Sequence, residues 1–332
     1  MLAPNSSLKY PAKQAENVFL LELPKELVGK EQFYIKSDPE SGTAFLATDH
    51  STFKMRQAST SNTIQIVADG AVLVETNAYI ELAKHVPILK SLKRLLNEHK
   101  YPGKLNPPHE LSINQIYETF PASNDEIDRV LKMEKALNID GYYRKLSPDY
   151  LLRFFEILHS NAILSDTSLL KCSVTEFEEM MAECEQEYPA HITRQILSHY
   201  SVDGNLSPCE VVRLFGYELL RAKPSWKAQE LEVALQKLIG DLEPNLDHLK
   251  GLYLEENSKV IFYPFDHLPD EPEARFEGLF SKRPKWKYDD IVHFLKDIGD
   301  YYQGVDKMIV KYCRIWTDQD GNKCVASKLI HE

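Results

Sequence analysis

The chain has 332 residues, of which 43% are hydrophobic and 27% charged, and its formal net charge is −11. This composition is typical of a folded globular protein, and it excludes both a disordered polymer and a protein that coats nucleic acid through bulk positive charge. Five cysteines without a Cys-x-x-Cys pair argue against a zinc ribbon or a disulfide framework, and they favour a reducing compartment. The length predicts about two to four domains.

Residues 1–104 are predicted to form a strand-rich domain that ends in a basic helix. Turn signals separate six short runs of strand-forming residues, at 18–21, 33–35, 43–48, 52–59, 63–67 and 71–74. Such a set indicates a small β-barrel or half-sandwich whose exposed edges would be completed by partner chains. The helix from Ile88 to Lys100 turns its leucines inward, and we interpret its lysines and arginine as a solvated face rather than a nucleic-acid contact.

The chain beyond residue 104 is predicted to be helical and weakly repetitive. An Asp-Gly turn precedes a Ser-Pro helix start twice, at Asp140 with Ser147 and at Asp203 with Ser207. Capping boxes are predicted for three serine–glutamate pairs, Ser123 with Glu126, Ser173 with Glu176 and Ser207 with Glu210. The overall prediction is an α+β protein in which tandem winged helices, at 105–170, 171–268 and 269–332, follow the N-terminal domain.

The last of these units has the most complete pattern. Apolar residues at helical spacing predict one helix from Asp289 to Ile298 and a second from Val305 to Lys311. A twofold period then predicts a β-hairpin, with strands at 312–316 and 323–327 around an Asp-Gly turn. Helices followed by a two-stranded wing form a scaffold that docks DNA, although the same scaffold also serves protein contacts.

Positive charges gather in this last unit. Residues 105–180 carry 7 lysines and arginines against 13 acidic residues, and residues 181–268 carry 8 against 14, so both would repel DNA and suit protein docking. We interpret Trp286 as a core anchor. The alternative to a DNA contact is a solvated basic rim. The residues predicted to contact phosphates are Lys282, Arg283, Lys285, Lys287, Lys307, Lys311, Arg314 and Lys323.

Motifs of catalysis are absent from the sequence. There is no P-loop, dinucleotide fingerprint, metal-binding His-Glu-x-x-His helix or Gly-x-Ser-x-Gly elbow, and the histidines lack ligand spacing. We therefore expect no enzyme activity, no cofactor and no metal. No apolar run reaches the length of a membrane span, and the first residues lack the pattern of a signal peptide, so we expect an intracellular protein.

An ordered series of short segments resembles one family, that of the proteins called defective in sister chromatid cohesion one. The resemblance covers nearly the whole chain and is strongest from about 245 to 300. Its segments are Thr60-Ser61-Asn62-Thr63, the basic helix near 90–96, Ile139-Asp140-Gly141-Tyr142-Tyr143-Arg144, Asp247-His248-Leu249-Lys250-Gly251-Leu252, Asp266-His267-Leu268-Pro269, Arg275-Phe276-Glu277-Gly278-Leu279-Phe280 and Lys285-Trp286.

The resemblance implies a nuclear, non-ATPase subunit of the alternative, replication-factor-C-like clamp loader used in sister-chromatid cohesion. It implies a barrel shared with a small companion subunit and the C-terminal tail of the large loader subunit. It also implies winged helices that contact DNA polymerase epsilon and single- and double-stranded DNA, and an indirect action on the sliding clamp. Partner contacts are expected at Phe19, Leu21, Phe53, Met55, Thr60, Ser61, Asn62 and Ile64.

Two other classes of protein stay open at this point. One is a tandem winged-helix adaptor that joins proteins without binding DNA. The other, a weaker alternative, is a hydrolase that uses cysteine and histidine.

Overall fold

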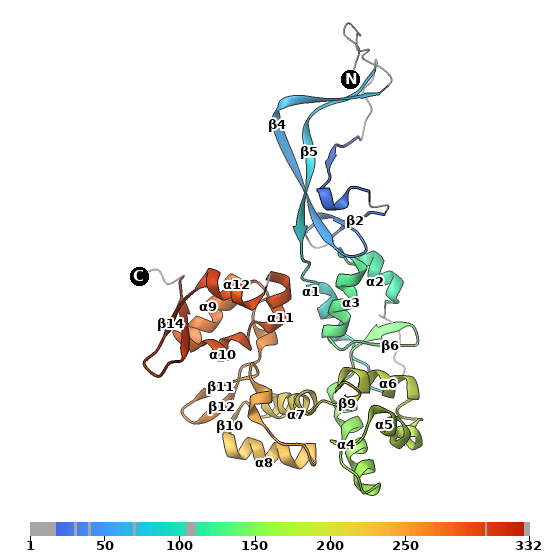
Figure 1. Ribbon diagram of the computed structural model, residues 1–332. Coiled ribbons are helices and arrows are strands. Elements are labelled where there is room, and N and C mark those ends of the chain that lie inside the picture. The colour runs from blue at the N-terminus through green and yellow to red at the C-terminus, as the bar shows by residue number, and fades with distance from the viewer. Residues whose placement is uncertain are drawn as a thin grey trace. The chain divides into compact units, whose positions relative to one another are not determined.

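The computed structural model describes residues 18–29, 32–38, 41–68, 71–103, 111–302 and 304–328. The chain is a mixed α+β protein (Figure 1). It divides into two compact units, one made of Met1–Leu89 with Ile113–Val130 and the other of Lys90–Ser112 with Leu131–Glu332. The domain limits placed at residues 104, 170 and 268 stay predictions, and residues 104–110 lie outside the described part.

The first unit is built on a curled five-stranded sheet with the strand order β1-β5-β4-β3-β2. All neighbouring strands are antiparallel except β1 and β5, which are parallel. Within the described residues the order starts at β1 and ends at β2, so the sheet is open rather than a closed barrel. The strands are β1 (Leu21–Glu22), β2 (Tyr34–Ser37), β3 (Ala44–Ala47), β4 (Thr52–Ala68) and β5 (Ala71–His85), with the 3-10 turn η1 (Lys25–Leu27) after β1.

Two of these strands are much longer than predicted. The runs at 52–59 and 63–67 form a single strand of 17 residues, and the run that starts at Ala71 continues to His85. The prediction of six short strands is therefore wrong, because β4 pairs with β5 on both sides of the polar stretch that looked like a break and continues through it. The register of the two strands shifts between Ser59 and Ile64, and Figure 1 shows the ribbon bent along its length.

Two helices of this unit, α2 (Ile113–Thr119) and the start of α3 (Asn124–Met133), are tied to the sheet by polar contacts. Lys36 on β2 donates from Nζ to the carbonyl oxygens of Tyr117 and Ala122, each at 2.6 Å. The capping box of Ser123 and Glu126 is confirmed by reciprocal hydrogen bonds. The Thr52 hydroxyl donates to the same Glu126 carboxylate at 2.6 Å and so joins β4 to the helix start.

The second unit begins with helices and two short hairpins. Both predicted Asp-Gly turns are confirmed, with Asp140 at φ 54° and Asp203 at φ 52° in the left-handed region. The elements are α1 (Lys90–Glu98), the hairpin β6 (Leu137–Ile139) with β7 (Tyr142–Arg144), α4 (Pro148–Leu164), α5 (Val174–Met181), η2 (Ala182–Cys184), α6 (Ala190–His199) and the hairpin β8 (Ser201–Val202) with β9 (Asn205–Leu206).

Of the two capping boxes predicted in this part of the chain, the structure confirms one. Ser173 and Glu176 form a complete capping box. Ser207 makes no side-chain capping bond, so its predicted box is wrong. The Glu210 carboxylate pairs instead with Lys135 Nζ at 2.6 Å, a tertiary contact that the local pattern could not reveal.

The rest of the unit repeats one order of elements: a helix, a short strand, one or more helices and a hairpin that pairs with the short strand. The first copy has the sheet order β10-β12-β11 and the second β13-β15-β14. The first copy comprises α7 (Pro208–Ala222), β10 (Ser225–Lys227), α8 (Ala228–Ile239), η3 (Leu246–Leu249), β11 (Tyr253–Glu256) and β12 (Lys259–Phe262), followed by η4 (Phe265–His267). The second comprises α9 (Pro272–Lys282), β13 (Lys285–Lys287), α10 (Tyr288–Val292), α11 (Lys296–Gly299), η5 (Asp300–Tyr302), α12 (Val305–Tyr312), β14 (Cys313–Thr317) and β15 (Lys323–Ser327).

The predicted terminal hairpin and the helix that starts at Val305 are confirmed. The single helix predicted from Asp289 to Ile298 is wrong, because turn residues 293–295 separate α10 from α11. Arg275 explains the interruption: its side chain is fully buried, and its Nη1 donates to the Phe294 carbonyl at 2.9 Å. That carbonyl is therefore bonded to a side chain instead of continuing the helix.

Candidate partner-docking and nucleic-acid surfaces

The first unit carries an apolar hollow of about 410 Å³ beside β1 and the ribbon of β4 and β5. Phe19 stands at its rim with 74% of its surface exposed, and Val18 is 46% exposed. Monomeric proteins rarely leave a phenylalanine so open beside other apolar side chains, so this is a candidate contact surface. Its lining comprises Val18, Phe19, Leu20, Ala44, Met55, Arg56, Gln57, Thr76, Ala78, Tyr79 and Ile80.

The sheet also presents strand edges next to this hollow. β3 pairs with β4 only at Thr52, Phe53 and Lys54, and β1 pairs with β5 only at Ile80 and Glu81. Among the described residues, the rest of β4 and β5 pairs only within the ribbon itself. A two-stranded ribbon is marginally stable in water by itself, and its free edges can pair with another strand.

The predicted partner-binding residues are divided by the structure into three groups. Phe19 and Met55 line the hollow. Thr60, Ser61, Asn62 and Ile64 lie on β4, at and next to the shift in register where the ribbon bends. Leu21 packs against the small core of this unit, and Phe53 is part of it at 2% exposure, so Phe53 supports the sheet from within rather than facing a surface.

The outward face of the terminal sheet gathers three of the predicted DNA-binding cations. Lys285 lies opposite Ala326, and Arg314 lies opposite the same residue from the other side. Lys287 is opposite Cys324, whose other neighbour is Trp316. Because alternate residues of a strand share a face, Lys285, Lys287 and Arg314 project on one side together with the partly exposed Trp316. Cations around an aromatic ring suit contact with a phosphate backbone.

The other five predicted cations lie elsewhere on this unit. Lys282 ends α9, Arg283 follows it, and the Arg283 guanidinium lies over the Trp286 ring with 5.2 Å to its centroid. Lys307 and Lys311 lie on α12. Lys323 is on the inward register of its strand and places Nζ 3.5 Å from the Tyr288 ring centroid. Trp286 is 3% exposed, which confirms it as a core anchor.

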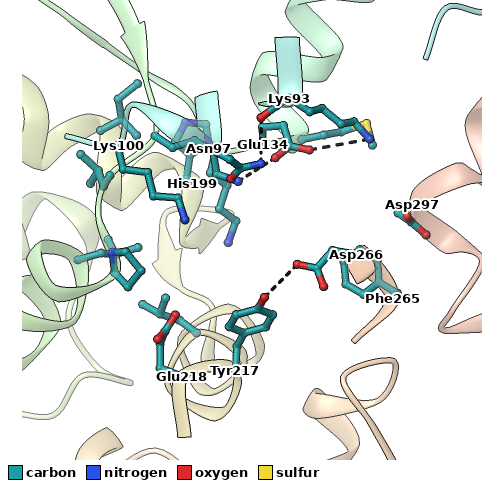
Figure 2. A pocket seen from close by; sticks show the side chains of 18 of the residues that line it. Lys93, Asn97, Lys100, Glu134, His199, Tyr217, Glu218, Phe265, Asp266 and Asp297 are labelled. Atoms are coloured by element: carbon teal, nitrogen blue, oxygen red, sulfur yellow. Dashed lines mark hydrogen bonds and ion pairs between the residues drawn. The ribbon is translucent and has the colours of Figure 1, made fainter. Parts of the chain in front are cut away.

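A larger cavity, of about 940 Å³, lies within the second unit and was missed by the sequence analysis (Figure 2). The basic face of α1 lines it with Lys90, Lys93 and Arg94. This face was predicted to be solvated, which holds for Lys90, 52% exposed, and for the exposed Arg94, but the Lys93 side chain is only 19% exposed. The spacing of these cations at positions i, i+3 and i+4 shows that they share a helical face, but not that other elements cover Lys93.

No group of three or more His, Cys, Asp or Glu residues that could hold a metal ion occurs in the described part of the chain. None of the helices that the structure describes combines the length and the apolar character that a membrane crossing requires.

Taken together, these features define a mixed α+β protein with an open, apolar-edged sheet in one unit and a basic-faced sheet at the end of the other. A family model described as sister chromatid cohesion protein Dcc1 matches residues 18–295. The chain therefore belongs to the Dcc1 family.

Individual relatives agree with this assignment. The chain is 27% identical to sister chromatid cohesion protein DCC1 of Mus musculus, over 87% of this chain and 81% of that protein. It is 24% identical to a probable sister chromatid cohesion protein DCC1 of Dictyostelium discoideum, over 86% of each chain. Sister chromatid cohesion protein DCC1 of Saccharomyces cerevisiae is 23% identical, over 61% of this chain and 58% of the relative. Family membership supports a role in sister chromatid cohesion.

Proposed function

We propose that this chain is a non-catalytic scaffold subunit of the alternative, replication-factor-C-like clamp loader. It would act in the nucleus, in DNA replication and sister chromatid cohesion, and would help to load or unload the sliding clamp without contacting it directly. The observation that carries the proposal is the match to the Dcc1 family over residues 18–295.

The first unit would dock to the small companion subunit and to the C-terminal tail of the large loader subunit. Its open sheet supports this, because incoming strands could pair with the edges of the ribbon while their side chains fill the apolar hollow. The bulge at Thr60–Asn62 supports it as well, since a bend in a long ribbon lets added strands curl toward closure.

Co-purification tests this part of the proposal. The full chain is co-expressed with the companion subunit and the tail of the large subunit, and Phe19→Asp is compared with Val233→Asp. Both residues are exposed, at 74% and 59%, so neither change threatens folding. If the partner buries the Phe19 side chain on binding, Phe19→Asp should weaken the complex by about tenfold or more. Equal recovery of the companion with both variants would contradict docking at the hollow.

The repeated order of helix, short strand, helix and hairpin supports the proposal that the second unit contains tandem winged helices. The last copy would hold single- and double-stranded DNA through the outward face of Lys285, Lys287 and Arg314. The acidic segments that precede it would contact the catalytic subunit of DNA polymerase epsilon, because their charge disfavours DNA.

Fluorescence anisotropy of labelled DNA tests the DNA contact. Wild-type full-length chain should bind with an affinity that falls as salt rises. Replacing Lys285, Lys287 and Arg314 by glutamate should lower the slope of log affinity against log salt by about 2 to 3 for duplex DNA, if each cation holds one phosphate. The matched control replaces three exposed lysines of other elements, Lys171, Lys237 and Lys259, by glutamate. Wild-type chain that fails to bind at any salt concentration would favour an adaptor that joins proteins only.

A further inference from the structure

The cavity of about 940 Å³ in the second unit combines a charged wall with an apolar floor. Its volume lies at the upper end of the roughly 300–1,000 Å³ that is usual for ligand pockets. We call the apolar part of the lining the floor, and it includes Leu137, Leu146, Leu151, Ile196, Leu214 and Phe265. Figure 2 shows charged and polar side chains of several elements turned toward the same space.

The acidic side chains of this cavity are already engaged by groups of the chain itself. This holds for all five carboxylates that the structure describes in the lining, so none of them calls for an external cation. The pairs are Glu134 with Lys145 at 2.8 Å, Asp266 with the Tyr217 hydroxyl at 3.1 Å, Glu218 with Arg221 at 2.5 Å, Asp297 with Arg275 at 2.5 Å and Asp270 with Arg275 at 3.8 Å.

Lys100 is in the opposite situation. Its side chain is partly buried and points into the cavity (Figure 2), yet it makes no hydrogen bond or ion pair with any residue that the structure describes. Burial and the nearby Lys145 ammonium lower the pKa of Lys100, and the charges of Glu218 and Asp266 only partly oppose this shift. Neither carboxylate bonds to Lys100, so part of the free energy lost on desolvating the ammonium stays uncompensated, and an anion hydrogen-bonded to it would remove that part.

We propose that this cavity binds a short peptide segment of a partner protein, with an acidic side chain on Lys100 and a neighbouring large apolar side chain on the leucine-rich floor. A peptide fits better than a nucleic acid for two reasons. The apolar floor offers no partner to a chain of phosphates, and the five carboxylates in the lining would repel a polyanion that followed the cations. The proposal stands whether or not the clamp-loader function is correct.

Selection from a displayed library of random heptapeptides, with the full chain as bait, tests it. Enriched peptides should carry an acidic residue next to one or more large apolar residues. Their fluorescein-labelled versions are then titrated against four proteins: the wild type, Lys100→Met, Lys100→Glu and the control Lys171→Glu. Lys171→Glu changes the net charge by the same amount as Lys100→Glu, but Lys171 is exposed and lies outside the cavity.

Loss of a charge-assisted hydrogen bond should weaken peptide binding about tenfold or more in Lys100→Met, and further in Lys100→Glu. The control should bind like the wild type. The proposal is overturned if no peptide is enriched, if the enriched peptides lack acidic residues, or if they bind Lys100→Glu as well as wild type. It is also overturned if a labelled single-stranded oligonucleotide competes with the peptide and loses binding in Lys100→Glu to the same degree. Unchanged circular dichroism and melting of the Lys100 variants show that lost binding does not reflect unfolding.

Discussion

Replacing the buried Arg275 by methionine should destabilise the last part of the chain far more than replacing the exposed Arg221. The Arg275 side chain is fully buried and donates to the carbonyls of Pro269 and Phe294 at 2.6 and 2.9 Å, and to the Asp297 carboxylate at 2.5 Å. Methionine fills most of the volume but leaves the carboxylate and these carbonyls without their donor. Removing one partner of such a buried pair costs about 3–5 kcal/mol.

Amide hydrogen exchange read by mass spectrometry measures this cost in the intact chain. Peptides from α9 and β13 should exchange about two to four orders of magnitude faster in Arg275→Met, since each factor of ten corresponds to about 1.4 kcal/mol. Arg221→Met is the matched control, because Arg221 pairs with Glu218 one helical turn away and its side chain is 58% exposed. Its loss should cost less than about 0.5 kcal/mol.

The pH dependence gives a second, independent check. Burial raises the pKa of Asp297 above its ordinary value, and Arg275 opposes that rise. The stability linked to this carboxyl is therefore present below its unfolded pKa and is lost as pH increases through its folded pKa. Without Arg275 the folded pKa rises further, so the deficit of the variant should be larger at about pH 7.5 than at about pH 5. A deficit that is independent of pH, or less than a tenfold change in exchange, would refute the buried ion pair as the source of stability.

Three smaller predictions follow from local geometry. Gly251 has φ +87°, and a Cβ there would lie 2.6 Å from the His293 carbonyl oxygen, so Gly251→Ala should cost at least about 2 kcal/mol by the same exchange measurement. Ser173→Ala should cost about 1 kcal/mol in denaturant unfolding, whereas Ser207→Ala should be close to neutral, because only Ser173 makes a capping bond; equal costs would contradict this. Cys313 is buried, and burial raises the pKa of its thiol to about 12, so iodoacetamide should modify it last in the native chain, and early modification would contradict the packing.

Elements fixed by neighbouring residues could be predicted from the sequence. The Asp140-Gly141 and Asp203-Gly204 turns are correct because each depends on residues that tolerate positive φ within a few positions. The terminal hairpin follows in the same way from its twofold period and its Asp-Gly step.

Features that depend on distant partners could not be predicted. Thr60, Ser61 and Asn62 look like a break between strands, yet β4 continues through them because its residues on both sides pair with β5. Glu210 looks like half of a capping box, but Lys135, far away in sequence, takes its carboxylate. Lys100 belongs to a helix end that appears solvated in sequence, and only the folding of α6, α7 and the 265–270 segment around it creates a cavity. In each case a tertiary contact overrides a local preference.

The segments that carry the resemblance to the Dcc1 family act mainly in packing. The Arg275 side chain is fully buried and donates to the carbonyls of Leu268 and Pro269, which end the Asp266-His267-Leu268-Pro269 segment. The Trp286 indole donates to the Leu279 carbonyl at 3.2 Å and so joins two further segments of the series. Gly251 allows the close approach of the His293 backbone. The resemblance therefore reports chiefly how the second unit is held together.

The surfaces proposed to act lie on other side chains: Phe19 at the hollow, Lys285 on the outward sheet face and Lys100 in the cavity. Because these residues are exposed or only partly buried and are not hydrogen-bonding or ion-pair partners of Arg275, substitutions there should impair one interaction each and leave the stability of the chain within about 0.5 kcal/mol. Substitutions of the packing residues should instead weaken DNA and peptide binding together, through loss of the folded second unit. Stability and each binding activity should therefore be measured on the same variants. Loss of one interaction at unchanged stability indicates independent contact surfaces, whereas joint loss of all binding with stability indicates that the surfaces depend on one fold.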